Sequence, residues 1–186
     1  MALESKTPLA AYLFPTELGW TALIWQGNQL RRLTIGHPSA AAAAAALHNA
    51  ADSLACEPNE LPAWVRDLTE RLQSYAAGIE EDFADIPLDL SHLSEFQTRV
   101  VRACRKIRRG RVRSYGELAT AAGSPGAARA VGSVMAKNRF PIIIPCHRVV
   151  GANQSLGGFS APTGLNLKQR MLTLEGAQLK QPRTLV

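Results

Sequence analysis

Residues Ser114-Tyr-Gly-Glu-Leu-Ala-Thr-Ala-Ala-Gly-Ser-Pro-Gly-Ala-Ala-Arg-Ala-Val-Gly-Ser-Val-Met-Ala-Lys137 decide the fold of the second half of the chain. The opening Ser-x-x-Glu pattern is a capping box, which predicts a first helix that Gly123 would end. Ser124 and Pro125 then predict the N-cap and first position of a second helix. Two short helices joined by a tight glycine turn indicate a helix-turn-helix.

The charge around this stretch is strongly positive. Residues 99–148 hold 12 Lys/Arg against one acidic residue, whereas residues 1–98 hold 5 against 13 and residues 149–186 hold 4 against one. The net charges of the three segments, taken along the chain, are −8, +11 and +3. Such a concentrated basic block is typical of a nucleic-acid binder, and a solvated basic face is the alternative.

The second helix is rich in small side chains. Small residues allow a helix to approach another surface closely, which in this basic block favours DNA and otherwise indicates tight packing against a neighbouring helix. The residues concerned are Gly126, Ala127, Ala128, Ala130, Gly132 and Ser133.

Downstream lies Pro141-Ile-Ile-Ile-Pro-Cys-His-Arg-Val-Val150, whose isoleucine run predicts a buried strand that ends at Pro145. Cys146 at that end is a candidate nucleophile, which needs a base such as His147. Neighbouring side chains of an extended segment point to opposite faces, so contact between them requires a bridging water or a turn after Pro145. Glu175 is the first candidate for a carboxylate that orients His147, and Glu117 is the second.

The flanking segments complete a mostly helical C-terminal part. A capping box at Ser94 predicts a helix whose apolar face includes Cys104, so we expect that thiol to be packed and inert. Residues 151–164 are rich in glycine and serine, the composition of a binding loop. A last helix is predicted from Leu165 to Glu175, followed by a polar tail from Gln178.

The N-terminal part predicts a small α/β domain. Apolar runs at 20–25 and 30–35 surround Gly27-Asn28, the signal of a β-hairpin. An alanine-rich run from residue 40 to Leu54 predicts one helix, and the spacing of residues 62–77 predicts another. The charge changes sign near residue 90, so we place the domain boundary there, with domains at 1–90 and 91–186.

The 186 residues are enough to bury a core, and no apolar run is as long as a transmembrane helix. The first residues lack the pattern of a signal peptide, so we expect a soluble intracellular protein without a membrane partner. Three scattered cysteines suit a reducing compartment and provide neither a disulfide framework nor a zinc motif. We therefore expect no bound metal.

The segment Pro145-Cys-His-Arg-Val149 resembles the signature of the O6-alkylguanine-DNA alkyltransferases, the methylated-DNA–protein-cysteine methyltransferases. The resemblance runs from about Phe96 to Gly176. It includes Ser114-Tyr-Gly-Glu-Leu-Ala119, Ala128-Arg-Ala-Val-Gly132, Asn138 and Gly157-Gly-Phe-Ser160. Several motifs in the family's order make it far more specific than any one of them.

The resemblance implies a suicide DNA-repair protein that needs no cofactor. Cys146 would take the alkyl group from guanine O6, and by extension from thymine O4, and keep it as a thioether. A water would link Cys146 to His147, with Glu175 behind His147, and Asn138 would brace the turn. The family's fold implies a ribonuclease-H-like N-terminal domain and a winged-helix-like C-terminal domain. It also implies a monomer in the cytoplasm, at the nucleoid in a bacterium or in the nucleus in a eukaryote.

The implied partner is double-stranded DNA that contains O6-alkylguanine, with the damaged base flipped out of the helix. The helix-turn-helix would enter the minor groove, Arg129 would fill the gap left by the base, and Tyr115 would contact the flipped base and its phosphate. Ser160 would contact O6, and backbone groups of Cys146 and Val149 would read the guanine edge. The full set of implied DNA and substrate contacts is Tyr115, Ala128, Arg129, Gly132, Ser133, Arg148, Val149, Phe159 and Ser160.

The chain departs from the family pattern at three places. No proline directly follows Asn138, Phe159 stands where some members have tyrosine, and the segment 160–164 is about two residues longer than in some relatives. The two loop changes bear on which alkyl groups fit. Three other kinds of protein share some of these features. A non-catalytic alkyltransferase-like protein lacks the cysteine, a plain helix-turn-helix regulator needs no Pro-Cys-His run, and a cysteine hydrolase leaves the basic block unexplained.

Overall fold

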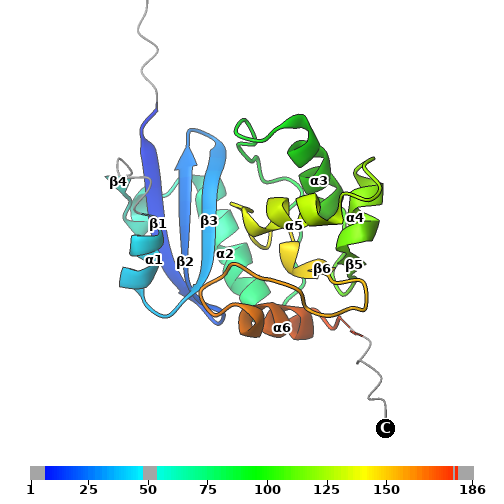
Figure 1. Cartoon of the computed structure of the whole chain (residues 1–186). Helices are drawn as coiled ribbons and strands as arrows, with labels where there is room; N and C mark the ends of the chain where they lie inside the picture. Colours follow the sequence, from blue (N-terminus) through cyan, green and yellow to red (C-terminus); the bar gives the residue numbers. More distant parts are fainter. Residues whose placement is uncertain (1–6, 48–53, 178, 180–186) are drawn as a thin grey trace, which may run out of the picture. The chain divides into compact units, whose positions relative to one another are not determined.

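The computed structural model describes residues 7–47, 54–177 and 179, and the chain divides into two compact units, Met1–Asp89 and Leu90–Val186 (Figure 1). The first unit is an α/β unit with a small, mainly antiparallel sheet, and the second is mostly helical. Within the described residues, no helix combines the length and the apolar character that crossing a membrane requires. The predicted tail from Gln178 falls almost entirely outside the described residues.

The sheet of the first unit has the strand order β3-β2-β1-β4. Strands β1 (Leu9–Thr16), β2 (Gly19–Gln26) and β3 (Gln29–His37) are antiparallel neighbours, and the short β4 (Leu54–Ala55) lies parallel to β1. The predicted hairpin is confirmed: Gln26 pairs with Gln29, and Gly27 takes the positive φ of 55° that this tight turn requires.

Helices cover the sheet. Helix α1 (Ala40–Ala46) begins at the N-cap Ser39, whose hydroxyl accepts a hydrogen bond from the Ala42 amide, and it packs Ala43 against the sheet face that carries Ala22 and Ile24. The α1 segment ends with Leu47 as its C-cap, and residues 48–53 of the predicted alanine-rich helix lie outside the described residues. A short 3-10 turn (Pro58–Glu60) precedes α2 (Ala63–Ala76), which packs against β1 close to its predicted bounds.

The second unit is built on three mutually packed helices, α3 (Glu95–Arg105), α4 (Tyr115–Ala121) and α5 (Ala128–Ala136). Both predicted capping boxes are present, at Ser94 and at Ser114. The helices share a core of Val100, Cys104, Leu118, Ala119, Val131 and Val134. Cys104 is fully buried there, and burial raises its pKa well above the usual range, as expected of an inert thiol.

Helix α5 begins later than the sequence predicted. Its N-cap is Ala127, so Ser124 does not cap it and Pro125 is not its first residue. Gly126 has a φ of 88°, which a right-handed helix cannot contain, and the Ala127 amide instead closes a turn onto the Ser124 carbonyl. The connection between α4 and α5 is therefore a hydrogen-bonded turn at 124–127, and Ser124 is not an N-cap.

The isoleucine run is buried, but the prediction of a strand was wrong. Residues 141–145 form turns, with Ile142 at a φ of 72° and the Ile144 amide bonded to the Phe140 carbonyl. A φ of 72° lies outside the β region, so Ile142 interrupts any strand, and Pro141 and Pro145 each remove one backbone donor at its ends. The chain continues into a 3-10 turn, η2 (Cys146–Arg148).

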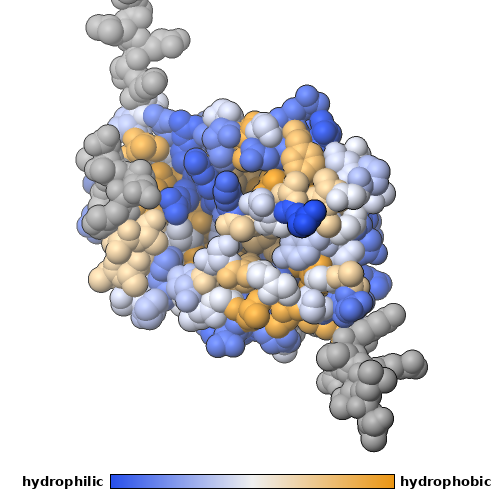
Figure 2. Space-filling view, in the orientation of Figure 1, coloured by the Kyte–Doolittle hydropathy of each residue, from blue (hydrophilic) through white to orange (hydrophobic). Residues whose placement is uncertain are grey.

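A two-stranded parallel ladder then positions the site. Strand β6 (Val149–Val150) pairs with β5 (Arg113–Ser114), and this brings the residues after Cys146 beside the start of α4. The last helix is α6 (Leu165–Leu174), with Glu175 as its C-cap. Apolar residues reach the surface around α6, where Leu165 is 44% exposed (Figure 2).

Candidate functional site

Cys146 opens the 3-10 turn and is 7% exposed. A helical turn separates neighbouring side chains by about 120° rather than pointing them to opposite faces. This is the turn after Pro145 that the sequence left as one of two ways to bring Cys146 and His147 to a common site. Burial raises the pKa of the Cys146 thiol, opposed by the Asn138 amide, by the charge of Lys168 and by nearby backbone amides. The thiol therefore needs a base to become a thiolate.

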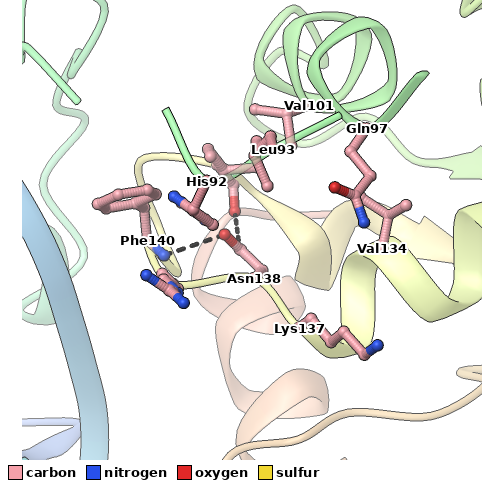
Figure 3. A pocket seen from close by; sticks show the side chains of 10 residues that line it. His92, Leu93, Gln97, Val101, Val134, Lys137, Asn138 and Phe140 are labelled. Carbon is pink, nitrogen blue, oxygen red and sulfur yellow. Dashed lines mark hydrogen bonds between the residues drawn. The ribbon is translucent and has the colours of Figure 1, made fainter. Parts of the chain in front are cut away.

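Asn138 connects the end of α5 to this turn. Its Nδ2 donates to the Ile144 carbonyl at 2.8 Å, and its Oδ1 accepts from the Phe140 amide at 3.0 Å (Figure 3). Nδ2 also donates to Cys146 Sγ at 3.1 Å. The contacts reach Phe140, Ile144 and Cys146, so one amide side chain holds both the backbone before Cys146 and the sulfur itself. The bracing role that the family resemblance implies for Asn138 stays a prediction.

A cavity of about 200 Å³ is lined in part by Asn138. It opens between the segment before α3, helix α3 and the end of α5, and Figure 3 shows Asn138 and Phe140 at its wall. Cys146 and Tyr115 are not among its lining residues, which are His92, Leu93, Gln97, Val101, Val134, Lys137, Asn138, Arg139, Phe140 and Ile144.

His147 is buried with Glu175 as its partner. The distance from His147 Nε2 to Glu175 Oε1 is 2.8 Å, and both side chains are 0% exposed. Burial lowers the pKa of His147 although Glu175 opposes the shift, so the imidazole is neutral at neutral pH. For Glu175 burial raises the pKa, but the hydrogen bonds and charges of His147 and Arg148 outweigh it and hold the pKa well below the usual range. The carboxylate requires a hydrogen on Nε2, which leaves Nδ1 as the basic nitrogen.

Arg148 was expected among the DNA and substrate contacts, but its guanidinium points inward. Nε and Nη2 each donate to Glu175 at 2.8 Å, and Nη1 donates to the Ile107 carbonyl at 2.5 Å. A bidentate pair of this kind fixes the carboxylate in one orientation. Arg148 therefore acts on the site through Glu175 and is not presented to a ligand.

Tyr115 begins α4 and is half-buried. Gly132 and Gly157 make room for its ring: a Cβ at Gly132 would come within 3.9 Å of the ring and one at Gly157 within 3.1 Å. Burial, and then the charge of Cys146, raise the pKa of Tyr115, while a hydrogen bond from the Gly158 amide lowers it. Tyr115 thus contacts the glycine-rich loop and lies near enough to Cys146 for the charge of the sulfur to affect the pKa of the tyrosine.

The remaining predicted contacts lie around this centre. Arg129 and Ser133 are exposed on α5, one helical turn apart, and Ser133 Oγ donates to the Arg129 carbonyl. Ala128, Gly132 and Phe159 are partly exposed. Val149 is fully buried, and its carbonyl already accepts a hydrogen bond from Lys168 Nζ at 2.6 Å, so a ligand would have to share or displace that bond. The Ser160 hydroxyl donates to the Ala136 carbonyl at 2.9 Å, so its hydrogen must turn away from α5 before it can reach another acceptor.

Lys168 belongs to the site and was missed from the sequence. It is 0% exposed on α6, and the Cys146 pKa is lowered by its charge. A signal was present: Lys168, Leu172 and Glu175 follow at i, i+4 and i+7, so the lysine shares a helix face with the carboxylate. The described residues contain no group of three or more His, Cys, Asp or Glu side chains that could hold a metal ion.

Comparison with known proteins places this geometry in a family context. Residues 95–177 match the model of the 6-O-methylguanine DNA methyltransferase DNA-binding domain. A methylated-DNA–protein-cysteine methyltransferase of Mycolicibacterium paratuberculosis is 51% identical over 106 residues, which cover 57% of this chain and 62% of that protein. The protein of the same name from Mycobacterium leprae is 46% identical over 119 residues, which cover 64% of this chain and 70% of that protein.

The similarity to solved structures extends to nearly the whole chain. The crystal structure of Mycobacterium tuberculosis O6-methylguanine methyltransferase has a TM-score of 0.73 and 33% identity, and covers 95% of this chain and 97% of that chain. The Mycobacterium tuberculosis OGT in complex with DNA has a TM-score of 0.68 and 32% identity, and covers 90% of this chain and 92% of that chain.

Proposed function

This chain belongs to the O6-methylguanine DNA methyltransferase family, and on that premise we propose that it repairs alkylated DNA by moving the alkyl group from guanine O6 onto Cys146, once per molecule. The observation that carries the choice of acceptor is the buried Cys146 sulfur, held by Asn138 beside the buried His147–Glu175 pair. Neither of the other two cysteines has such a setting. Cys56 lies in the first unit, and Cys104 is packed inside the helical core of the second.

The transfer is a single in-line displacement. The Cys146 sulfur forms a bond to the alkyl carbon as the bond from that carbon to O6 breaks, and the electron pair stays on the guanine. The guanine takes up one proton and becomes an ordinary base, while the sulfur becomes a thioether. Atoms and charge balance without a cofactor, and the absence of a step that regenerates the thiol makes the reaction stoichiometric.

The thiol proton must leave first, because burial raises the pKa of Cys146. We assign its acceptance to His147 Nδ1, directly or through one water, with Glu175 stabilising the imidazolium that forms. Glu175 is ionised and is already hydrogen-bonded to His147 Nε2. It therefore needs no rearrangement when the imidazole becomes positively charged. Arg148 holds Glu175 in place, and Asn138 donates to the sulfur, which favours the thiolate.

Helices α4 and α5 are proposed to form a helix-turn-helix of a winged-helix-like unit that enters the minor groove of double-stranded DNA containing O6-alkylguanine. The packing of α4 on α5 and the exposed Arg129 support this assignment. Arg129 would fill the space of the flipped base, while Tyr115, Ser160 and the backbone of Val149 would contact the base. The small residues Ala128, Gly132 and Ser133 would let α5 lie close to the sugar-phosphate backbone, and Phe159 would limit the alkyl group.

The first unit is proposed to have a ribonuclease-H-like fold. Its strand order β3-β2-β1-β4, with β4 parallel to β1 beside an antiparallel meander, supports that assignment. We propose that the whole protein acts as a monomer and in the compartment that holds the DNA.

The decisive experiment weighs the intact protein after incubation with duplex DNA that contains O6-methylguanine. The expected result is a gain of one methyl group per chain, located on Cys146 by peptide mapping. The Cys146→Ala variant should gain none, and Cys56→Ser should react like the unmodified protein. A gain that persists in Cys146→Ala, or no gain in the unmodified protein, contradicts the proposal.

A further inference from the structure

Lys168 is a buried cation that the proposed transfer does not use. It lies in the first turn of α6, next to the buried Leu167 and three residues before the buried Met171, and it is 0% exposed. Lysine is almost never fully buried unless its charge is paired. A lysine that merely packed its stem would extend its ammonium to solvent, and this one does not.

The ammonium of Lys168 is satisfied by three backbone carbonyls. Nζ donates to Val149 O at 2.6 Å, to Leu156 O, and to Gly158 O at 3.4 Å. An ammonium has three hydrogens, so the three carbonyls use all of its donors. Among the described residues no carboxylate forms an ion pair with it, so the charge is stabilised by oriented peptide dipoles.

These carbonyls belong to two different segments. Val149 follows the 3-10 turn of Cys146 directly, whereas Leu156 and Gly158 lie in the glycine-rich loop at 151–164. The loop's own backbone bonds in the described residues are local ones, such as Gly151 to Ser155 and Gly164 to Ala161. Lys168 therefore supplies two of the hydrogen bonds that connect the loop to the rest of the unit, beside those made by Ser160 and by the Tyr115–Gly158 pair.

We propose that Lys168 is a positioning residue: its ammonium ties the glycine-rich loop to the strand that follows Cys146, and this tie sets the loop wall of the pocket that receives the alkylated base. The inference rests on the proposed function for the identity of the ligand. The tie itself rests on the three hydrogen bonds alone.

The electrostatics support this arrangement. Burial lowers the pKa of Lys168 to about 8, and the charge of Cys146 opposes the shift. Lys168 in turn lowers the pKa values of Cys146 and His147, which are the titratable groups that interact with it. A neutral amine has two hydrogens and cannot serve three carbonyls, so the full tie exists only in the charged form.

Hydrogen exchange tests the tie without any reaction. In Lys168→Met, which keeps the length and removes charge and donors, loop amides at 151–164 should exchange about tenfold faster or more at neutral pH, because the loop opens locally. The amides of α2 in the first unit serve as the internal reference. Arg170→Met removes an exposed positive charge from the same helix and should leave loop exchange unchanged.

The second variant, Lys168→Gln, retains two donors without the charge and should give an intermediate exchange rate. If Lys168→Met loses protection in α3 of the second unit, that variant is not folded, and Lys168→Gln then decides the question. Loop exchange within about twofold of the unmodified protein in the folded variants overturns the tie.

Reaction with free O6-benzylguanine tests the link to the pocket. The half-saturating concentration in Lys168→Met should rise about tenfold, with a smaller change in the rate at saturation, because a loose wall weakens binding before it affects displacement. If the loop amides of Lys168→Met exchange faster but the half-saturating concentration is unchanged, the proposed role of Lys168 at the pocket is wrong. If the unmodified protein takes up no alkyl group, the proposed function fails, and the exchange result still decides whether Lys168 ties the loop.

Discussion

Glu175 is a single carboxylate on which both the proposed proton relay and the local fold depend. Its oxygens serve His147 and Arg148, and its side chain is 0% exposed. In Glu175→Gln the imidazolium loses its counter-charge, so the rate of transfer from free O6-benzylguanine should fall about 100-fold or more. The buried guanidinium of Arg148 also loses its partner, which should lower the free energy of unfolding by about 3 kcal/mol.

The pH dependence of unfolding checks the same residue. The folded-state pKa of Glu175 is held below its ordinary value of 4.5, so its contribution to stability is present above that pH and is lost as the pH falls through and below it. In Glu175→Gln the free energy of unfolding should not show this fall at acidic pH. Glu117→Gln, at the cap of α4, removes the other carboxylate considered from the sequence and should leave the reaction with the free base unchanged. An equal loss in both variants would exclude Glu175 as the specific partner of His147.

At the residue scale, the sequence predicted the proposed acceptor and the members of the proposed relay, but not the direction in which the neighbouring cations point. The Pro-Cys-His-Arg-Val segment and the single acid of the last helix were enough to select Cys146, His147 and Glu175. The spacing of Lys168 and Glu175 puts both on one helix face, but it does not identify the acceptors that hold the ammonium. Arg148 and Lys168 are held inside by carbonyls and a carboxylate from distant segments, and only the tertiary structure brings those acceptors together.

Glycine in the loop controls how the loop packs on the start of α4. A Cβ at Gly157 would lie 3.1 Å from the Tyr115 ring and hydroxyl, and the φ of Gly157 is 65°. Gly157→Ala should therefore displace Tyr115 or the loop, lower the free energy of unfolding by about 1 kcal/mol and slow alkyl transfer. Thermal unfolding and single-turnover kinetics measure the two effects. Gly158→Ala meets nothing within 4 Å and should have the smaller effect, and the opposite order would contradict this packing.

A substitution on helix α5 can test the DNA-binding step separately from the alkyl transfer. Arg129 is exposed on this helix and has no part in the relay. Arg129→Ala should slow repair in duplex DNA by about tenfold or more while the reaction with free O6-benzylguanine stays nearly unchanged, because only the duplex requires the base to be flipped out. Arg102→Ala removes an exposed charge from α3 and should slow duplex repair much less. Equal losses on the two substrates would contradict the role of Arg129.

At the element scale, local chemistry predicted the elements whose signals are local. The hairpin at Gly27-Asn28 and the capping boxes at Ser94 and Ser114 depend on a few adjacent residues, and all are confirmed. The errors came where two local signals compete. At 141–145 the prolines override the strand preference of isoleucine, and at the start of α5 the positive φ of Gly126 overrides the capping preference of Ser124.

Across the whole molecule, the two units differ sharply in charge. Residues 1–89 carry a net charge of −7 and residues 90–186 carry +13. The 16 basic residues of the second unit are not equivalent, because Lys168 and Arg148 are engaged inside it. The cations that remain available to phosphates are those exposed on the second unit, which in its described part are Arg99, Arg102, Lys106, Arg108, Arg111, Arg113, Arg129, Lys137, Arg139 and Arg170.

The salt dependence of DNA binding measures how many of these cations contact phosphates. If about five do, the logarithm of the binding constant should fall with the logarithm of salt concentration with a slope of about −4.5, which is about 500-fold between 50 and 200 mM. Fluorescence anisotropy of an undamaged duplex gives the slope. Lys137→Ala should reduce its magnitude by about 0.9 if Lys137 contacts a phosphate, whereas Lys168→Gln should leave it unchanged, since a buried ammonium releases no counterion. A slope near zero would mean that the basic block is a solvated face, and a reduced slope in Lys168→Gln would contradict the inward assignment of that charge.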